Sequence, residues 1–261
     1  MDFNIILLSF IQGISEILPI SSSINLHFFS HIFNINTFSF SLKIALHTGS
    51  LIALMIFFRR EIFDIFSGIF GSKSIKNTHL LPLFFGTIPV VIIGYFARDY
   101  VKEFDSPKIM GILSILFGII LFLIDKLSYH KSRTDKNPIS IAKAFIIGCF
   151  QTIAIFPGVS RLGICITASR MLGLDRKKSI YFSLFLAIPS ILGSLTLELF
   201  ECYQKHDFQI FSNDSLIGII STAIISLLAM WYCIKYMENR GFGVLVLYRI
   251  VIGIITCFAF C

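Results

Sequence analysis

The chain consists mainly of long apolar stretches separated by short polar segments. Crossing a bilayer takes about 20 predominantly apolar residues. Six stretches meet this requirement, at 41–58, 79–97, 109–125, 179–199, 215–236 and 243–260. The pattern therefore predicts an all-α integral membrane protein with six transmembrane helices.

Two further apolar stretches, at 3–27 and 144–167, are interrupted by Pro19 and by Pro157-Gly158. Each interruption leaves helical pieces that are too short to cross the bilayer. Irregular backbone at membrane depth persists only where protein or a wet cavity satisfies its polar groups. We therefore expect two re-entrant helix hairpins in addition to the six spans.

The order of these elements repeats along the chain. One hairpin and three spans occupy residues 1–125, and the same order returns in residues 140–261 after a polar linker. Because three spans are an odd number, the second copy enters the membrane upside down. We expect one membrane domain made of two interdigitated inverted repeats, with the site at their interface near the midplane.

Basic residues orient this topology. Of the 22 Lys and Arg residues, 15 lie in the loops at 59–78, 126–143, 168–178 and 235–240, and four lie in the loops on the opposite side. The basic-rich side is expected to face the cytoplasm. Both termini then lie outside, the hairpin with Glu16 enters from outside, and the hairpin with Arg161 enters from the cytoplasm.

Composition supports the membrane assignment. Hydrophobic residues make up 56% of the chain, charged residues 14%, and the mean hydropathy is +0.84. These values exclude a soluble domain of this length. The net charge of +7 follows from the topology, so no nucleic-acid partner is expected. The six cysteines show no paired spacing, and the apolar N-terminus lacks the basic segment of a signal peptide.

The first interruption contains the first group of candidate residues. Gln12 and Glu16 are one helical turn apart and share a face. A charge inside the membrane costs roughly 2.5–3.5 kcal/mol on insertion scales, so we read Glu16 as functional, either a general base or a metal ligand. The alternative is a structural carboxylate paired with Arg. Ser21, Ser22 and Ser23 follow Pro19 as caps, anion ligands or a nucleophile, with at least one expected to cap.

The second interruption places Arg161 in the first turn of a new helix, after the N-cap candidate Ser160. A guanidinium there can hold phosphate oxygens bidentately beside the helix N-terminus. A cation at that helix end is unfavourable unless an anion is bound. The pattern therefore favours phosphate binding, and the alternative is an Arg paired only with Glu16.

Three further polar residues lie inside spans. His47 is either a catalyst or a hydrogen-bonded packing residue. Arg249 either pairs with the site or extends toward the interface, and Lys43 is expected to extend toward the outer interface.

These residues form motifs that resemble a known family. Gln12-Gly13-x-x-Glu16-x-Leu18-Pro19-x-Ser21-Ser22-Ser23 and Pro157-Gly158-x-Ser160-Arg161-x-Gly163 are similar to the two signatures of the undecaprenyl-diphosphatase family. The likeness extends to Leu46-His47-x-Gly49 and Tyr248-Arg249-Ile250, and covers essentially the whole chain.

The resemblance implies an enzyme of the bacterial plasma membrane with a pocket open to the outer face. It would hydrolyse a long polyprenyl diphosphate to the monophosphate, recycling the lipid carrier of cell-wall synthesis. Glu16, Ser22 as nucleophile and Arg161 would be catalytic. Mg²⁺ or Ca²⁺ at Glu16 is a possible cofactor. The implied substrate-binding residues are Gln12, Ser21, Ser23, Asn25, His47, Gly158, Ser160 and Arg249.

The chain departs from the family pattern twice. Ile24-Asn25 stands where the family has Gly-His, so an imidazole expected there is missing, with His27 and His47 as candidate substitutes. Leu162-Gly163-Ile164-Cys165 stands where the family has Ser-Gly-x-Thr. Two alternative functions stand beside hydrolysis. Inverted repeats with broken helices also suit a polyprenyl-phosphate flippase or transporter, which would not need the hydroxyl run beside Glu16. Asn25 suggests a catalytically impaired member that binds its lipid.

Overall fold

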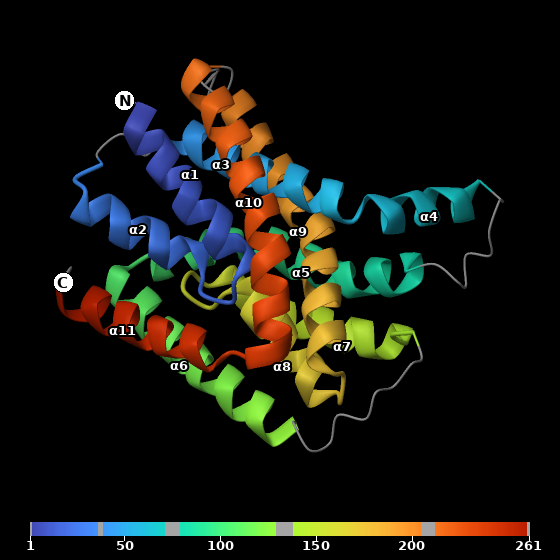
Figure 1. Ribbon diagram of the computed structural model, residues 1–261. Coiled ribbons are helices and arrows are strands. Elements are labelled where there is room, and N and C mark those ends of the chain that lie inside the picture. The colour runs from blue at the N-terminus through green and yellow to red at the C-terminus, as the bar shows by residue number, and fades with distance from the viewer. Residues whose placement is uncertain (1, 36–38, 71–78, 129–137, 205–211, 260–261) are drawn as a thin grey trace.

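The computed structural model describes residues 2–35, 39–70, 79–128, 138–204 and 212–259. Within these ranges the chain is helical and contains no strand, which confirms the predicted all-α class. Figure 1 shows the helices crossing one another in a single bundle. Their bounds are α1 (Asp2–Ile17), α2 (Ser22–Ile32), α3 (Phe40–Phe57), α4 (Arg59–Ile69), α5 (Leu80–Val101), η2 (Lys102–Phe104), α6 (Pro107–Ser128), α7 (Ile141–Gln151), η3 (Thr152–Ile155), α8 (Arg161–Met171), α9 (Arg176–Gln204), α10 (Asn213–Arg240) and α11 (Gly243–Ala259).

Five of the described helices are long and apolar enough to cross a membrane, namely α3, α5, α6, α9 and α10. They coincide with five of the six predicted spans. The sixth predicted span is α11, an apolar helix of 17 residues. At 1.5 Å per residue such a helix is about 25 Å long, at the short end of the spanning range. The chain is therefore a multi-pass membrane protein.

The predicted interruptions of the other two apolar stretches are present. Residues 18–21, the first break, separate α1 from α2, and residues 156–160, the second break, separate η3 from α8. The pieces on either side contain 11 to 16 residues, apart from the single turn of η3. Pro19 and Pro157 lie inside the breaks, as expected of a residue that cannot donate a backbone hydrogen bond.

Segment 59–78 differs from the expected loop, because its first part forms helix α4. Arg59, Arg60 and Asp64 lie on this helix together with the exposed side chains of Phe63 and Phe66. The alternation of charged and aromatic positions suits an amphipathic helix. Such a helix contains no long apolar stretch, so hydropathy alone does not predict it.

Helix α10 packs against both α1 and α3, while α6 pairs with α11 and α5 with α7. Glycines allow close approach at the crossing with α3. A Cβ on Gly49 would lie 2.5 Å from the carbonyl oxygen of Ile219 and 2.8 Å from Cβ of Thr222. Small residues at such crossings are typical of helix packing in membranes.

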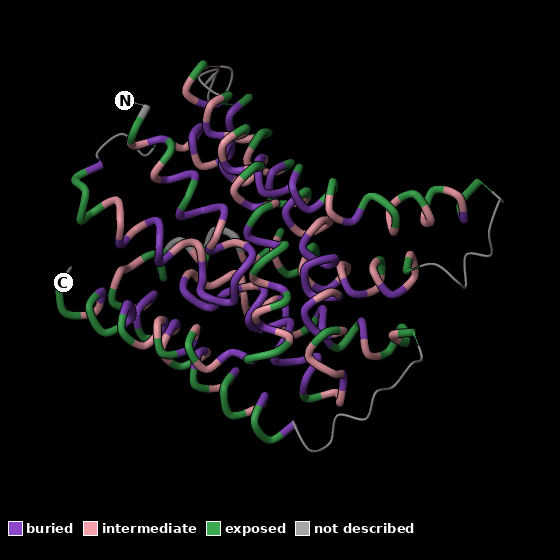
Figure 2. Tube along the Cα trace, in the orientation of Figure 1, coloured by how far each residue is buried: buried purple, intermediate pink, exposed green. Residues whose placement is uncertain are grey.

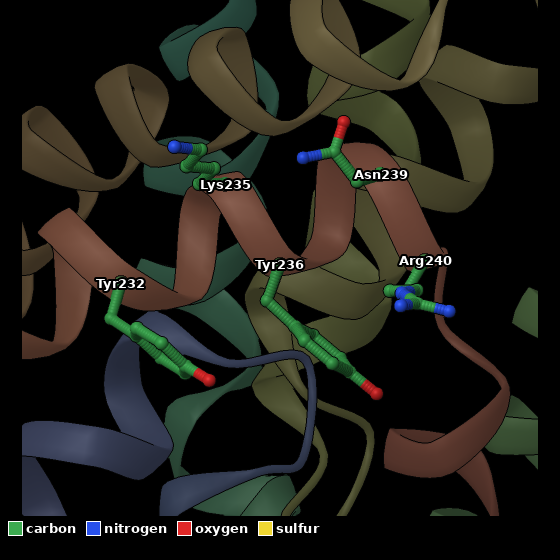
Figure 3. Close-up of a pocket in the computed structure, with 5 residues that line it drawn as sticks. All are labelled: Tyr232, Lys235, Tyr236, Asn239 and Arg240. Carbon is green, nitrogen blue, oxygen red and sulfur yellow. The ribbon is translucent and has the colours of Figure 1, made fainter.

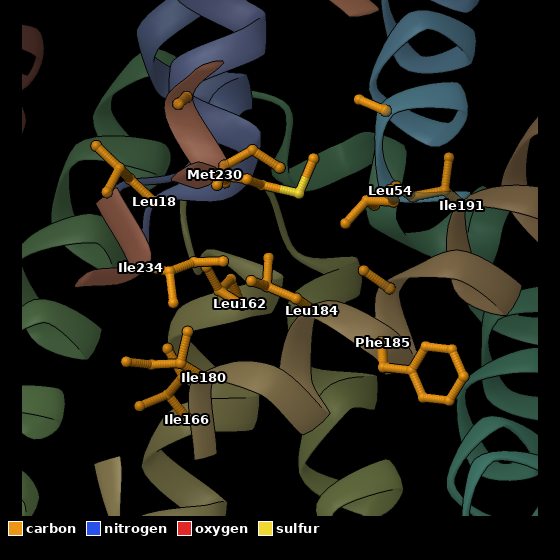
Figure 4. Packing of buried hydrophobic residues seen from close by; sticks show 14 of the residues in the cluster. Leu18, Leu54, Leu162, Ile166, Ile180, Leu184, Phe185, Ile191, Met230 and Ile234 are labelled. Carbon is orange, nitrogen blue, oxygen red and sulfur yellow. The ribbon is translucent and has the colours of Figure 1, made fainter. Parts of the chain in front are cut away.

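Buried residues gather around the two breaks, while exposed residues lie toward the outside of the bundle (Figure 2). Many of these exposed residues are large and apolar. In the largest buried cluster, Leu18 of the first break and Leu162 of α8 pack with Met230 and Ile234 of α10 (Figure 4). The same apolar core thus packs against the first break and against the helix that follows the second break.

An ion cluster fastens the far end of α8. Arg170 Nε donates to Asp125 Oδ1 of α6 over 3.0 Å, and Arg176 Nη2 donates to Asp125 Oδ2 over 2.7 Å. Arg170 is 1% exposed. Because charged hydrogen bonds hold its C-terminal end, α8 presents its N-terminus at a fixed place.

Replacing Gly49 by Ala should destabilise the crossing of α3 and α10, because the new methyl group would collide with backbone atoms of α10. Overpacking of this kind costs typically 1–3 kcal/mol. The measurement is the thermal unfolding midpoint in detergent. Gly193→Ala on α9 is the matched control, since its Cβ would meet nothing within 4 Å. Equal midpoints for the two variants would contradict the predicted close approach.

Candidate active site

The two breaks share an unusual backbone conformation. Ser21 has φ 66° and ψ 108°, and Ser160 has φ 69° and ψ 108°. A positive φ in a residue with a side chain stores of order 1–3 kcal/mol of strain, and such residues cluster at functional sites. Two serines with nearly identical strained dihedrals, each directly before a helix, support the interpretation of the breaks as two copies of one module.

Their hydroxyl groups are used differently. Ser160 Oγ accepts a hydrogen bond from the Gly163 N–H at 3.2 Å and so caps α8, as expected. Ser21 occupies the N-cap position of α2 but makes no side-chain cap, and its Oγ lies 3.0 Å from Ser23 Oγ. The expectation that a hydroxyl of the Ser21–Ser23 run caps α2 is therefore wrong.

The second break touches the first turn of α2, which directly follows the first break. The Gly158 N–H of the second break donates to Ser23 Oγ of α2 over 3.1 Å. Gly158 has φ +96°, and a side chain there would collide with the backbone of Met110 on α6. Glycine is required at this position by both the dihedral angle and the space.

Arg249 of α11 lies behind both breaks and holds them together. Its Nη1 donates to the Pro19 carbonyl over 3.1 Å, and its Nη2 donates to the carbonyls of Gly158 and Val159 over 3.1 and 3.0 Å. Nε donates to Ser114 O on α6 over 3.0 Å. The residue is 1% exposed. Four backbone carbonyls thus surround the buried guanidinium.

A second polar cluster surrounds Glu16. Arg161 pairs with Glu16 through Nη2 and Oε1, and its Nη1 donates to the Ala187 carbonyl of α9 over 3.0 Å. Gln12 Nε2 donates to Glu16 Oε2 over 3.1 Å and lies 3.2 Å from Nδ1 of His47. Side chains from α1, α3 and α8 therefore meet at one carboxylate.

The side chain of Ser22 also lies close to this carboxylate. Ser22 is the first residue of α2 and is half-buried. The site thus brings together a nucleophile candidate, a carboxylate that can take its proton and a guanidinium at a capped helix N-terminus. Such a set suits attack on a phosphorus atom, because charge neutralisation and positioning dominate that chemistry.

Comparison with known proteins gives this arrangement a family. The family model described as "Bacitracin resistance protein BacA" matches residues 5–255. The chain belongs to this family.

Three curated relatives illustrate the family match. The undecaprenyl-diphosphatase of Pelagibacter ubique is 37% identical over 256 residues, covering 97% of this chain and 95% of its own. Undecaprenyl-diphosphatase 4 of Bacillus cereus is 32% identical, covering 95% and 93%. Undecaprenyl-diphosphatase 3 of Acinetobacter baylyi is 30% identical, covering 98% and 97%.

The structure brings most of the predicted site residues of this family member together. One group surrounds the carboxylate and the other forms the contact between the breaks; together they are Gln12, Glu16, Ser21, Ser22, Ser23, His47, Gly158, Ser160 and Arg161. Lys43 forms an ion pair with Glu198 over 3.4 Å instead of only extending toward the interface. His27, a candidate substitute imidazole, has Asp105 and His31 as its charged neighbours and is not among the groups around Glu16.

Asn25 and Arg249 take a role different from the predicted substrate contact. Asn25 is 1% exposed; its Nδ2 donates to Ile20 O and Ser21 O over 3.1 and 2.7 Å, and its Oδ1 accepts from the Tyr248 hydroxyl. Both side chains lie beneath the breaks and bond to backbone carbonyls. We therefore assign them to positioning the breaks.

The site offers few ligands for a resident metal ion. Among the described residues no group of three or more His, Cys, Asp and Glu side chains could hold one. Both oxygens of Glu16 are engaged, Oε1 by Arg161 and Oε2 by Gln12. The protein residues alone do not fit the predicted Mg²⁺ or Ca²⁺, so oxygen atoms of the substrate would have to complete its shell.

Two surface hollows lie elsewhere. One follows the last turns of α10, where Tyr232 and Tyr236 point to one side of the helix and Lys235 and Asn239 to the other (Figure 3). The second lies between α6 and α11. Neither contains a residue of the Glu16 cluster.

Sequence reasoning missed partners that have no sequence signal. The Ala187 and Pro19 carbonyls accept bonds from arginines 26 and 230 positions away in the chain. Arg170 reads from sequence as a basic loop residue yet is buried against Asp125. The motif Tyr248-Arg249-Ile250 includes Tyr248 but gives no sign of its hydrogen bond to Asn25.

Replacing Arg249 by Met should lower both stability and activity, because buried carbonyls in both breaks would lose their donor. Each unsatisfied buried group costs about 1–3 kcal/mol, so we expect the unfolding midpoint to fall by at least ~4 °C. Arg60→Met on the exposed face of α4 is the control. A normal midpoint and normal phosphate release in Arg249→Met would rule out the clamp.

Proposed function

We propose that the chain hydrolyses undecaprenyl diphosphate to undecaprenyl phosphate and phosphate at the Glu16 cluster. The observation that carries the proposal is the convergence of Ser22 and Arg161, each the first residue of a helix that follows a break, on one carboxylate. Membership of the bacitracin resistance family, with relatives named undecaprenyl-diphosphatase, supports this activity.

The ion pair between Arg161 and Glu16 is replaced when substrate binds. Without an anion the guanidinium neutralises the carboxylate, which removes the cost of two separate charges in the membrane. A diphosphate offers the guanidinium oxygens of greater charge, at a helix N-terminus that already favours anions. Transfer of Arg161 from Glu16 to phosphate then leaves a carboxylate without its cation beside Ser22, ready to accept a proton.

The reaction then proceeds in two steps. Ser22 Oγ forms a bond to the terminal phosphorus while the bond between that phosphorus and the bridging oxygen breaks. The proton of the Ser22 hydroxyl passes to Glu16. Polyprenyl monophosphate leaves with the bridging oxygen. A water molecule then attacks the phosphorus of the phosphoserine, and the bond to Ser22 Oγ breaks. The proton on Glu16 returns to Ser22. The released phosphate keeps one proton of the water, and the other proton passes to solvent.

We further propose the topology in which this site works. Six spans and two re-entrant hairpins form two inverted repeats, with residues 1–125 in the first and 140–261 in the second. The matching dihedral angles of Ser21 and Ser160 support this repeat. The first turn of α1 and the last turn of α11 lie toward the same side in Figure 1, in keeping with both termini outside. The site then opens to the outer face of the plasma membrane.

If Mg²⁺ or Ca²⁺ binds with the substrate, Glu16 is the protein residue that would hold it, and the ion would neutralise phosphate charge. No step above depends on it.

The hydroxyl beside the carboxylate favours hydrolysis over transport, because a flippase needs the anion site but no nucleophile. The burial of Asn25 argues against an impaired enzyme, because this side chain supports a break and is not placed to transfer protons.

Arg161→Ala should abolish phosphate release from polyprenyl diphosphate by purified protein, because the terminal phosphate loses its charged partner. Arg161→Lys should recover only part of the activity, since lysine provides a point charge without the bidentate fork. Near-normal turnover of Arg161→Ala would place the phosphate clamp elsewhere.

Glu16→Gln should fold normally but lose about 10²-fold or more in turnover, as is typical of a missing general base. Gln12→Ala is the comparison and should lose less, since an amide cannot act as the base. The measurement is the turnover number of both purified variants in the same detergent. Equal losses at the two positions would show that Glu16 has no special chemical role.

Asn25→His should bring no gain in turnover at any pH. A neutral imidazole has one donor, so it cannot serve the Ile20 and Ser21 carbonyls together as the Asn25 amide does. We expect equal or lower phosphate release and a lower unfolding midpoint. A pH-dependent rise in turnover would instead support a proton-transfer position at residue 25.

A further inference from the structure

His47 lies beside the Glu16 carboxylate in a defined setting. Its Nδ1 is 3.2 Å from Gln12 Nε2 and 3.9 Å from Glu16 Oε2. The other charged groups that face the ring are Arg161 of α8, Glu198 of α9 and, one turn earlier on α3, Lys43. The imidazole is therefore part of the cluster.

The hydrogen bonds of Gln12 determine which ring nitrogen carries the proton. Gln12 Nε2 donates to Glu16 Oε2 over 3.1 Å, and the reverse orientation of the amide would place its carbonyl oxygen against the carboxylate, where two acceptors face each other. The amide group therefore directs one hydrogen to Glu16 and the second to Nδ1. Because Nδ1 accepts this hydrogen, it carries no proton, and the proton of the ring is on Nε2.

Nε2 is open to a ligand. No described residue bonds to it, and the atom is not fully buried. The side chain of His47 is 21% exposed, compared with 7% for Glu16. The ring thus presents a fixed N–H donor to the accessible part of the site. Gln12 connects the ring to the Glu16 carboxylate beside Ser22.

We propose that His47 is a catalytic residue that donates its Nε2–H to a phosphoryl oxygen of the substrate, and that Gln12 imposes this role by holding Nδ1 as an acceptor. The proposal rests on the proposed function. His47 acts as a hydrogen-bond donor and not as a base, because the nitrogen that faces the substrate already carries its proton. The imidazole that is missing at residue 25 is supplied from α3.

Two substitutions distinguish the role of Nε2 from that of Nδ1. The amide nitrogen of Gln reaches about as far as Nε2, whereas that of Asn reaches only as far as Nδ1. His47→Gln should therefore keep phosphate release within about 10-fold of the wild type, and His47→Asn should lose roughly 10²–10³-fold, the usual cost of one missing donor to a reacting phosphoryl or acyl oxygen. Unfolding midpoints of both variants check that they fold. Equal losses in the two variants, or no loss in either, would overturn the proposal.

The tautomer can be measured without turnover. Nitrogen-15 NMR of histidine-labelled protein, with His47→Gln used to assign the signal, should show a neutral ring protonated at Nε2. Gln12→Ala should remove this preference for Nε2, because the substitution leaves Nδ1 without its hydrogen-bond donor. A wild-type ring protonated at Nδ1 would refute the proposal. Failure of the proposed function has a different signature, namely no phosphate release by the wild type itself.

Discussion

Broken helices inside a membrane leave backbone carbonyls that lipid cannot satisfy, and this constraint governs the centre of the molecule. Arg249 resolves it with one side chain, because its guanidinium donates to Pro19 in the first break and to Gly158 and Val159 in the second. The carbonyls in turn make burial of the cation tolerable. Both breaks are thereby held at one place, which is the condition for residues from both to share a site.

The charged residues of the site solve a second problem of the membrane, the cost of an isolated charge. Glu16 and Arg161 neutralise each other, and Gln12 orients the free oxygen of the carboxylate. The same pairing that permits burial also leaves the guanidinium available for an anion of higher charge. Stability without substrate and affinity for a diphosphate thus arise from one interaction, with the ion cluster at Asp125 fixing the helix that carries Arg161.

The inferred role of His47 explains how the site can lack the family imidazole at residue 25. Position 25 is a support beneath the first break, where an amide with two hydrogens serves two carbonyls. The donor that faces the site comes from α3, and Gln12 links it to Glu16. Departure from a motif at one position is therefore compatible with a complete site, because hydrogen-bonding capacity is distributed over several helices.

The membrane class, the positions of most helices and both breaks could be predicted from the sequence alone, because hydropathy and proline act locally along the chain. Glu16 and Arg161 could be singled out in the same way, since a charge inside an apolar stretch is conspicuous. Tertiary contacts were needed to show that Asn25 and Arg249 support the breaks, that Arg170 is buried, and that His47 rather than His27 joins the carboxylate. These outcomes depend on contacts between residues far apart in the chain, many of them with backbone carbonyls, which every residue possesses and no sequence pattern distinguishes.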